Sequence, residues 1–251
     1  MAVADLSYGK ANLEHAAASP TNIMQGALLI ALLTLPLLAL HSPSISLWGV
    51  HPATPVMIFA YVYGVRIVTE TKNLPMWHPR QTSETVEDLP DEEASHEKLG
   101  RLIIFFAMYA ALLAVAGYAV ALSGEAIAAQ IGLSETAVGG VFTAVSTSLP
   151  ELVTAIAAVQ RGALTLAVGN ILGGNAFDTL FLAVADVAYR KGSIYHAIGS
   201  RQAFLIVLTI LLTIILVMGL VRREKRGIAN IGSESFLILV LYLVAVVYLF
   251  M

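Results

Sequence analysis

The sequence contains no cysteine and little charge, and each shortage excludes classes of protein. Without cysteine, the chain cannot form disulfides, thiolate metal sites or a cysteine nucleophile. Only 12% of its 251 residues are charged, whereas soluble domains carry about 25%, so the chain cannot cover a soluble surface. Its net charge of -3 supplies no positive field for nucleic acid. With 58% hydrophobic residues and a mean hydropathy of +0.80, the composition indicates an integral membrane protein.

Apolar runs of about twenty residues predict membrane-spanning helices rather than the short alternating strands of a membrane barrel. The fold class predicted from them is all-α, a polytopic, multi-pass membrane protein with about seven transmembrane helices. The seven apolar segments are residues 22–40, 53–68, 102–122, 136–159, 164–189, 203–221 and 236–251.

Basic residues predict the orientation of these helices. Of the 14 lysines and arginines, only three (Arg190, Lys191 and Arg201) fall on the side opposite the N-terminus. The positive-inside rule therefore places the N-terminal side in the cytoplasm and the C-terminus outside. Residues 69–100 are rich in acids and proline, and they predict an acidic cytoplasmic linker. They lack the spacing of a calcium-binding loop, so a solvated linker is favoured over a regulatory calcium site.

An internal repeat relates two distant stretches of the chain. The sequence VADLSYGKANLEHAAAS from Val3 aligns without gaps with VADVAYRKGSIYHAIGS from Val184, and His15 matches His196. Each stretch is followed by an apolar segment, a loop and a last apolar segment. Residues 101–251 contain five of the predicted spans, and an odd number makes successive copies insert in opposite orientations, as in many secondary transporters.

The repeat predicts a division of the chain into three parts, in which the first copy is incomplete. The counterparts of the spans between residues 102 and 183 are absent from the first copy. The predicted parts are residues 1–68, the last two helices of a first repeat; residues 69–100, the linker; and residues 101–251, a complete five-helix second repeat.

Two acids, Glu151 and Asp178, fall inside apolar segments. An acid at mid-membrane costs about 2.5–3.5 kcal/mol on insertion scales, and such residues mark ion or proton paths. A structural ion pair is the alternative, but neither segment contains a basic residue at a comparable depth. The two acids are therefore the candidate functional residues.

Oxygen-bearing residues accompany Glu151. Pro150 has no amide hydrogen and leaves a carbonyl of the preceding turn without its helical donor. Thr147 and Ser148 lie four and three residues before Glu151, on the same helical face. A carboxylate, hydroxyls and loose carbonyls at one level suit a hard cation such as calcium.

A second cluster accompanies Asp178. Asn175 lies three residues before it, on the same helical face. A short turn at residues 160–163 would join the two acidic segments into a hairpin, so that their polar faces could meet. Nearby glycines predict a weakened helix and close approach of a second backbone; they are Gly169, Gly173 and Gly174.

The motifs STSLPELVTAI and AVGNILGGNAFDTLF resemble the α-repeat of the calcium/cation antiporter superfamily, and most closely the sodium/calcium exchangers. The motif match covers residues 138–182, and the five-span layout extends it to residues 101–251. The resemblance implies ten helices in two inverted five-helix repeats, which exchange Ca²⁺ for Na⁺ or H⁺ by alternating access.

The resemblance also implies the residues that bind cations. Glu151 would be the principal calcium ligand of this repeat, and Asp178 would occupy the second acidic position. Gly174 stands where the family usually has serine, which leaves sodium coupling open. The implied cation-binding set is Glu151, Asp178, Thr147, Ser148, Asn175 and the backbone near Ala144, with Glu151 and Asp178 as the metal ligands.

The leading hypothesis is therefore a Ca²⁺/Na⁺ antiporter that lacks its first α-repeat. Its expected partners are the lipid bilayer, the transported Ca²⁺ and Na⁺ (or H⁺), and either the missing helices or a second copy of the chain. The alternatives are an H⁺-coupled cation antiporter of the same fold and a non-transporting membrane fragment or assembly subunit. The sequence has no nucleotide loop, serine triad or zinc-binding helix motif, so we expect neither an enzyme nor a resident cofactor, and no nucleic-acid partner.

Overall fold

The computed structural model describes residues 12–73, 78–80, 82, 98–131, 144–225, 227 and 231–250. Helices dominate these residues, and the predicted all-α class is confirmed for them. The elements are α2 (Leu13–Ala16), α3 (Pro20–Leu40), α4 (Ala53–Asn73), α5 (Leu99–Ile131), α7 (Ala144–Gln160), α8 (Leu164–Ala188), the 3₁₀ turn η3 (Ile194–Ala197), α9 (Ser200–Arg222) and α10 (Ser233–Phe250).

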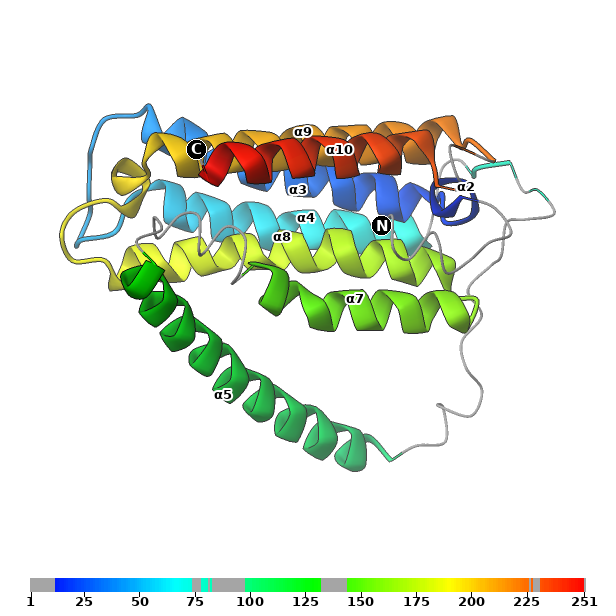
Figure 1. Cartoon of the computed structure of the whole chain (residues 1–251), viewed down its shortest axis with the longest axis horizontal. Coiled ribbons are helices and arrows are strands. Elements are labelled where there is room, and N and C mark those ends of the chain that lie inside the picture. Colours follow the sequence, from blue (N-terminus) through cyan, green and yellow to red (C-terminus); the bar gives the residue numbers. More distant parts are fainter. Residues whose placement is uncertain are drawn as a thin grey trace.

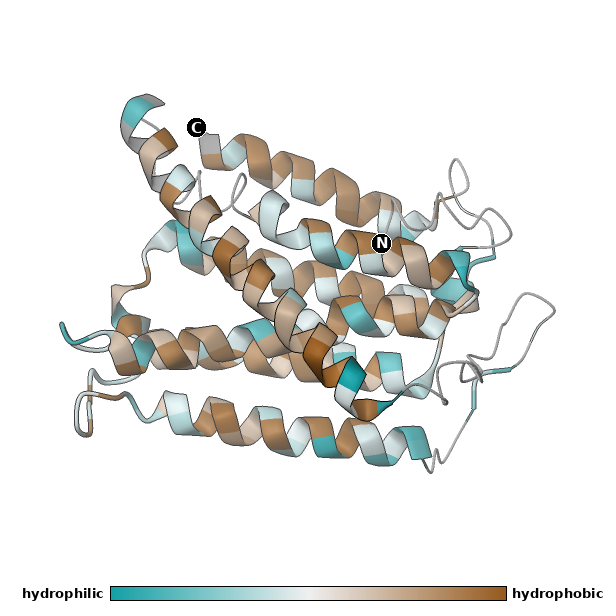
Figure 2. Cartoon of the chain, turned by 90° about the horizontal axis from the view of Figure 1, so that it is seen from below, coloured by the Kyte–Doolittle hydropathy of each residue, from teal (hydrophilic) through white to brown (hydrophobic). Residues whose placement is uncertain are grey.

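Four helices of the described part are long and apolar enough to cross a membrane. They are α3, the first part of α5 (Leu99–Gly124), α8 and α9, while α10 is apolar but shorter. Apolar residues cover most of the long helices, and hydrophilic residues gather towards their ends (Figure 2). These helices are those of an integral membrane protein.

The other predicted spans match the structure less well. The segment at residues 53–68 is part of α4, which continues through Asn73 into the range expected to be linker. Arg66 and Glu70 form an ion pair at 3.0 Å on this last part of α4, which supports the additional turn. The segment at residues 136–159 begins outside the described residues, and α7 is only 17 residues long.

The bundle is built around α3, which packs against α4, α8 and α9. In Figure 1 these helices run side by side, with α10 along α9 and α7 along α8, while α5 diverges from the bundle. Small residues allow the close contacts, as is usual between membrane helices. A Cβ atom at Gly26 would lie 2.3 Å from Cγ2 of Val217, and one at Gly64 would lie 2.2 Å from Cδ1 of Leu28.

Two histidines make corresponding hydrogen bonds at the C-terminal ends of α3 and α9. His196 Nε2 donates to the carbonyl oxygen of Ser42 at 2.8 Å, just after α3 ends. His15 Nδ1 donates to the carbonyl oxygen of Arg223 at 2.7 Å, just after α9 ends. His15 and His196 are 181 residues apart, and so are Ser42 and Arg223. This is the offset of the sequence repeat.

A second pair of contacts shows the same offset. The hydroxyl of Tyr195 lies 2.9 Å from that of Thr54 in α4. The residues 181 positions away from each are Glu14 and Ser235, and Ser235 donates a hydrogen bond to the buried carboxylate of Glu14. Residues at corresponding positions of the two aligned stretches thus connect η3 to α4 and α2 to α10.

Candidate functional site

The two acidic helices, α7 and α8, form a hairpin. Gly162 lies in the turn between them with a φ of 79°, a left-handed conformation that glycine adopts without strain. Its amide donates to the carbonyl of Val159 at 3.0 Å, and the amide of Ala163 donates to that of Ala158 at 2.9 Å. The predicted turn at residues 160–163 is therefore confirmed.

Glu151 lies on α7 with hydroxyl groups around it. Thr147 and Ser148, one turn earlier, are exposed like Glu151, and Ala144 is half-buried at the start of the helix. The Thr147 hydroxyl donates to the carbonyl of Ala144 at 3.2 Å. Pro150 lies inside α7, which is helical from Ala144 to Gln160. The oxygen-bearing residues expected around Glu151 thus follow one another on the same helix.

Asp178 lies on α8 and is also exposed. Asn175 is exposed one turn earlier and donates through Nδ2 to the carbonyl of Ile171 at 2.7 Å, which leaves its side-chain oxygen directed away from this bond. The structure therefore places the two acids on neighbouring helices, because α7 and α8 pack against each other.

The glycines that were expected to weaken the acidic segment do not break α8. The helix continues from Leu164 to Ala188 without a break. Gly169 and Gly173 instead make room for Gln25 of α3: a Cβ atom at Gly169 would lie 3.3 Å from Gln25 Oε1, and one at Gly173 would lie 3.5 Å from Nε2. Gly174 faces open space. Packing against α3 supports the helix where its sequence is weak.

The two acids make up only part of a metal-binding shell. Within the described residues, no three side chains of histidine, cysteine, aspartate or glutamate gather closely enough to hold a metal ion. Calcium takes six to eight oxygen ligands, so carboxylates from one hairpin do not complete its coordination.

A buried polar cluster that sequence reasoning missed lies at the other end of α8. Asp186 is 0% exposed and accepts hydrogen bonds from the backbone amides of His51 at 2.8 Å and Ile194 at 3.2 Å, and from the hydroxyl of Thr54. Burial and the charge of Asp186 raise the pKa of the Tyr195 hydroxyl, although the bond to Thr54 opposes this shift. The one signal in the sequence was the match of Asp186 with an aspartate in the repeat.

Polar groups also close the end of the bundle where α9 joins α10. Glu224 accepts hydrogen bonds from the hydroxyl and the amide of Ser233, the first residue of α10. These bonds, helped by the neighbouring charge of Arg222, lower the pKa of the Glu224 carboxyl. Arg222 also pairs with Glu234 at 3.0 Å. The cluster satisfies donors at the start of α10 and has a structural role.

A bundle of apolar helices with two carboxylates on one hairpin defines the class of helical membrane transporters. Comparison with known families gives the particular one: the chain belongs to the sodium/calcium exchanger protein family, whose model matches residues 101–251. The predicted resemblance is therefore confirmed.

Three curated relatives resemble the chain. It is 30% identical over 112 residues to the inner membrane protein YrbG of Escherichia coli (strain K12), a match covering 45% of this chain and 34% of YrbG. It is 31% identical over 102 residues to CaxA, an antiporter candidate of Alkalimonas amylolytica, covering 40% of this chain and 32% of CaxA. It is 27% identical over 115 residues to the sodium/calcium exchanger MaX1 of Methanosarcina acetivorans, covering 45% of this chain and 33% of MaX1.

The chain thus spans about a third of the length of the curated relatives that it matches. No solved structure matches it at a significant level.

Proposed function

We propose that this chain is part of a secondary antiporter that exchanges Ca²⁺ for Na⁺ by alternating access. The observation that carries the proposal is the placement of two acids, Glu151 and Asp178, on the two packed helices of one hairpin of apolar helices. Two acids without a basic partner in their spans are stabilised when a cation or a proton binds to them. The family match over residues 101–251 and the name of the relative MaX1 support calcium and sodium as the ions.

In this proposal Glu151 and Asp178 bind Ca²⁺ directly. Thr147, Ser148 and the carbonyl of Ala144 add neutral oxygens from α7. Asn175 adds a carboxamide oxygen from α8. Hard cations accept these ligand types, and the hairpin supplies about half the oxygens that calcium requires.

The remaining ligands come, in our proposal, from the helices of a first repeat. The corresponding hydrogen bonds of His15 and His196 support the assignment of α3–α4 and α9–α10 to two copies. In one copy α4 packs against α8, but α10 exposes Leu243, Val244 and Val247 and has no such neighbour among the described residues. A counterpart of α8 would cover this apolar face.

A second copy of the chain is a less suitable source of these helices. Because the repeats are inverted, the second copy would have to insert upside down in the membrane. The distribution of basic residues, with only Arg190, Lys191 and Arg201 on one side, favours a single orientation. The same distribution supports the proposal that the linker of residues 69–100 is cytoplasmic and the C-terminus outside.

Coupling to H⁺ instead of Na⁺ is the second candidate function. The observation that favours it is Gly174, which faces open space beside the acidic face of α8. A hydroxyl that the family usually places there is lacking, so one expected contact with sodium is lost. The same acids would then carry protons when no calcium is bound.

Uptake of radiolabelled calcium into liposomes that contain the purified chain tests both proposals. A Na⁺ gradient and an H⁺ gradient are imposed separately, and the wild-type chain is compared with E151Q, D178N and the matched control E70Q, which changes an exposed acid of α4. We expect Na⁺-driven uptake when first-repeat helices are supplied in the same liposomes, abolished in E151Q and D178N and retained in E70Q. Uptake driven only by H⁺ would select the second candidate, and equal uptake in all variants would refute the role of the acids.

Absence of uptake from the folded wild-type chain alone is expected both for the incomplete antiporter and for the third hypothesis, a fragment or assembly subunit. The same assay repeated with first-repeat helices supplied in the liposomes distinguishes the two. Restored uptake that still depends on Glu151 supports the incomplete antiporter. Continued absence supports a non-transporting role.

A further inference from the structure

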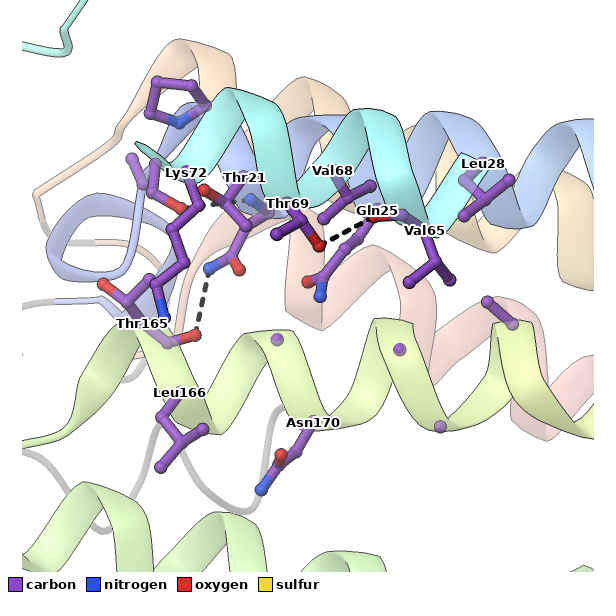
Figure 3. Close-up of a pocket in the computed structure, with 18 of the residues that line it drawn as sticks. Thr21, Gln25, Leu28, Val65, Val68, Thr69, Lys72, Thr165, Leu166 and Asn170 are labelled. Carbon is purple, nitrogen blue, oxygen red and sulfur yellow. Dashed lines mark hydrogen bonds between the residues drawn. The ribbon is translucent and has the colours of Figure 1, made fainter. Parts of the chain in front are cut away.

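A cavity of about 890 Å³ lies between α3, α4 and α8, near the end of the bundle where α4 finishes. Figure 3 shows side chains from all three helices pointing into it. Its volume is towards the upper end of the range for pockets that hold one small molecule. Neither Glu151 nor Asp178 is among the described residues that line it, although Gly174, one turn before Asp178 on α8, is.

The outer level of the cavity carries the positive charge of Lys72. Lys72 and His78 line it together with the hydroxyl groups of Thr21 and Thr165, and none of the described residues that line the cavity is an acid. In Figure 3 the side chain of Lys72 extends from the end of α4 towards Thr165 on α8. None of the ion pairs within the described residues involves Lys72. This level therefore suits an anion.

Helix ends add to this preference. α3 begins at Pro20 and α8 begins at Leu164, so the N-termini of two long helices lie at the level of Lys72. Backbone amides and the helix dipole at an N-terminus favour negative charge. The C-terminal end of α4 lies at the same level, and Lys72 offsets the negative end of its dipole.

The middle level of the cavity is lined by the carboxamide of Gln25 and by two glycines of α8. Gln25 reaches from α3 towards α8, where Gly169 and Gly173 leave space for its side chain (Figure 3). Gln25 Oε1 is buried, and no described residue forms a hydrogen bond with it. The neighbouring Asn22 differs, because its Nδ2 donates to Ala17 at 2.9 Å and to Thr165 at 3.2 Å. Gln25 is thus available to a bound molecule that carries both polar acceptors and a hydroxyl.

The inner level is apolar. Leu28 of α3, Tyr61 and Val65 of α4, and Ala176 of α8 line it, further from the helix ends than Gln25. The lining therefore changes along the helices from cationic, through hydrogen-bonding, to hydrophobic. That order matches the phosphate, glycerol and acyl parts of a phospholipid.

We propose that this cavity binds one anionic phospholipid. Its phosphate lies at Lys72 and the starts of α3 and α8, its glycerol region bonds to the carboxamide of Gln25, and an acyl chain runs along Leu28 and Tyr61. Basic pockets between membrane helices on the cytoplasmic side are suited to acidic headgroups. A free phosphate would use only the outer level and leave the apolar level unoccupied. The site does not depend on the proposed exchange activity.

Native mass spectrometry of the delipidated chain in detergent tests the proposal. The probes are short-chain phosphatidylglycerol, the matching phosphatidylcholine and inorganic phosphate. We expect phosphatidylglycerol to bind most tightly and inorganic phosphate not to compete at equal concentration. K72Q should weaken the binding of phosphatidylglycerol by about fivefold, the effect expected from one basic residue near an anionic lipid. It should leave the affinity for phosphatidylcholine unchanged.

Two further variants keep the result interpretable. K191Q removes an exposed lysine from the loop between α8 and η3 and should leave every affinity unchanged. Q25L keeps a side chain of similar size and should weaken the binding of both lipids. Circular dichroism checks that each variant stays folded. Equal affinity for the two lipids, full competition by inorganic phosphate, or a folded K72Q with unchanged affinity would overturn the proposal.

Discussion

Thr54 donates a hydrogen bond of 2.7 Å to the carboxylate of Asp186, and this bond joins the first turn of α4 to the last turn of α8. The same carboxylate oxygen also accepts the amide of His51, just before α4. An aspartate from one helix thereby satisfies donors at the start of another, where a helix has no partners of its own. The contact is fully buried and fixes how α4 and α8 meet.

Asp186→Asn should destabilise the fold strongly. The amide of asparagine replaces one acceptor oxygen with a donor, which would face the donors now bound to Asp186. Hydrogen bonds to a charged group contribute about 1.5–3 kcal/mol each, so we expect a loss of at least that size in the free energy of unfolding. Thermal unfolding in detergent measures it. The control Asp178→Asn changes an exposed acid and should have little effect, so similar losses in the two variants would contradict the prediction.

The fold class could be predicted from the sequence because length and apolarity alone decide it. Runs as apolar as α3 and α9 have no stable position except across a membrane. The ends of α4 could not be predicted in this way. Arg66, Glu70 and Lys72 make its last turns polar, yet these turns are helical and include the exposed ion pair of Arg66 with Glu70.

His15→Phe and His196→Phe should each lower stability by about 2 kcal/mol. Each variant keeps an aromatic ring but removes two hydrogen bonds of about 1 kcal/mol each, one to a carbonyl at the end of α9 or α3, respectively, and one to the hydroxyl of Thr82 or Ser193. Chemical denaturation in detergent measures the loss. The bonds share no partners, so the double variant should show the sum of the two effects. A neutral result for either single variant would argue against corresponding roles.

Gly169→Leu and Gly174→Leu should have opposite effects on stability. A Cβ atom at Gly169 would lie 3.2 Å from Oδ1 of Asn22, so leucine overpacks the contact between α8 and α3 and should cost about 1–3 kcal/mol. Gly174 has nothing within 4 Å, and replacing a helical glycine there should stabilise α8 by up to about 1 kcal/mol. Thermal melting of both variants checks the order, and a Gly169→Leu variant as stable as wild type would refute it.

The raised pKa of the Tyr195 hydroxyl predicts that the folded chain loses stability at high pH. Its pKa in the folded chain is raised above the ordinary value of 10.0, chiefly by burial. Below pH 10 the hydroxyl is neutral in both states and its full contribution is present. Above pH 10 it ionises first in the unfolded chain, so stability falls until the folded pKa is reached.

Tyr195→Phe tests this dependence. The variant loses the bond to Thr54 at all pH values, but its stability should fall less steeply than that of wild type above pH 10. Melting temperatures between pH 8 and pH 11 provide the comparison, with Tyr109→Phe on the exposed face of α5 as the control. Parallel curves for wild type and Tyr195→Phe would show that Tyr195 does not titrate as predicted.

The candidate cation residues could be identified from the sequence because an acid in an apolar span is costly and needs a reason. Glu151 and Asp178 were found by that argument. Their relation to the glycines was not, because the sequence does not show that Gln25, far away on α3, fills the space beside Gly169 and Gly173. Contacts between distant segments depend on helix packing, which periodicity within one segment does not encode.

Helix α8 carries residues of both candidate sites: Gly169 and Gly173 line the lipid-binding cavity, and Asp178 lies further along the same helix. A ligand on either side that prefers one position of this helix changes affinity on the other side by a fixed factor, and the effect is reciprocal. Ion concentration would therefore alter lipid occupancy as strongly as membrane composition altered ion affinity. α8 thus links the two binding equilibria in a single thermodynamic cycle, and their coupling can be measured by varying the concentration of either ligand.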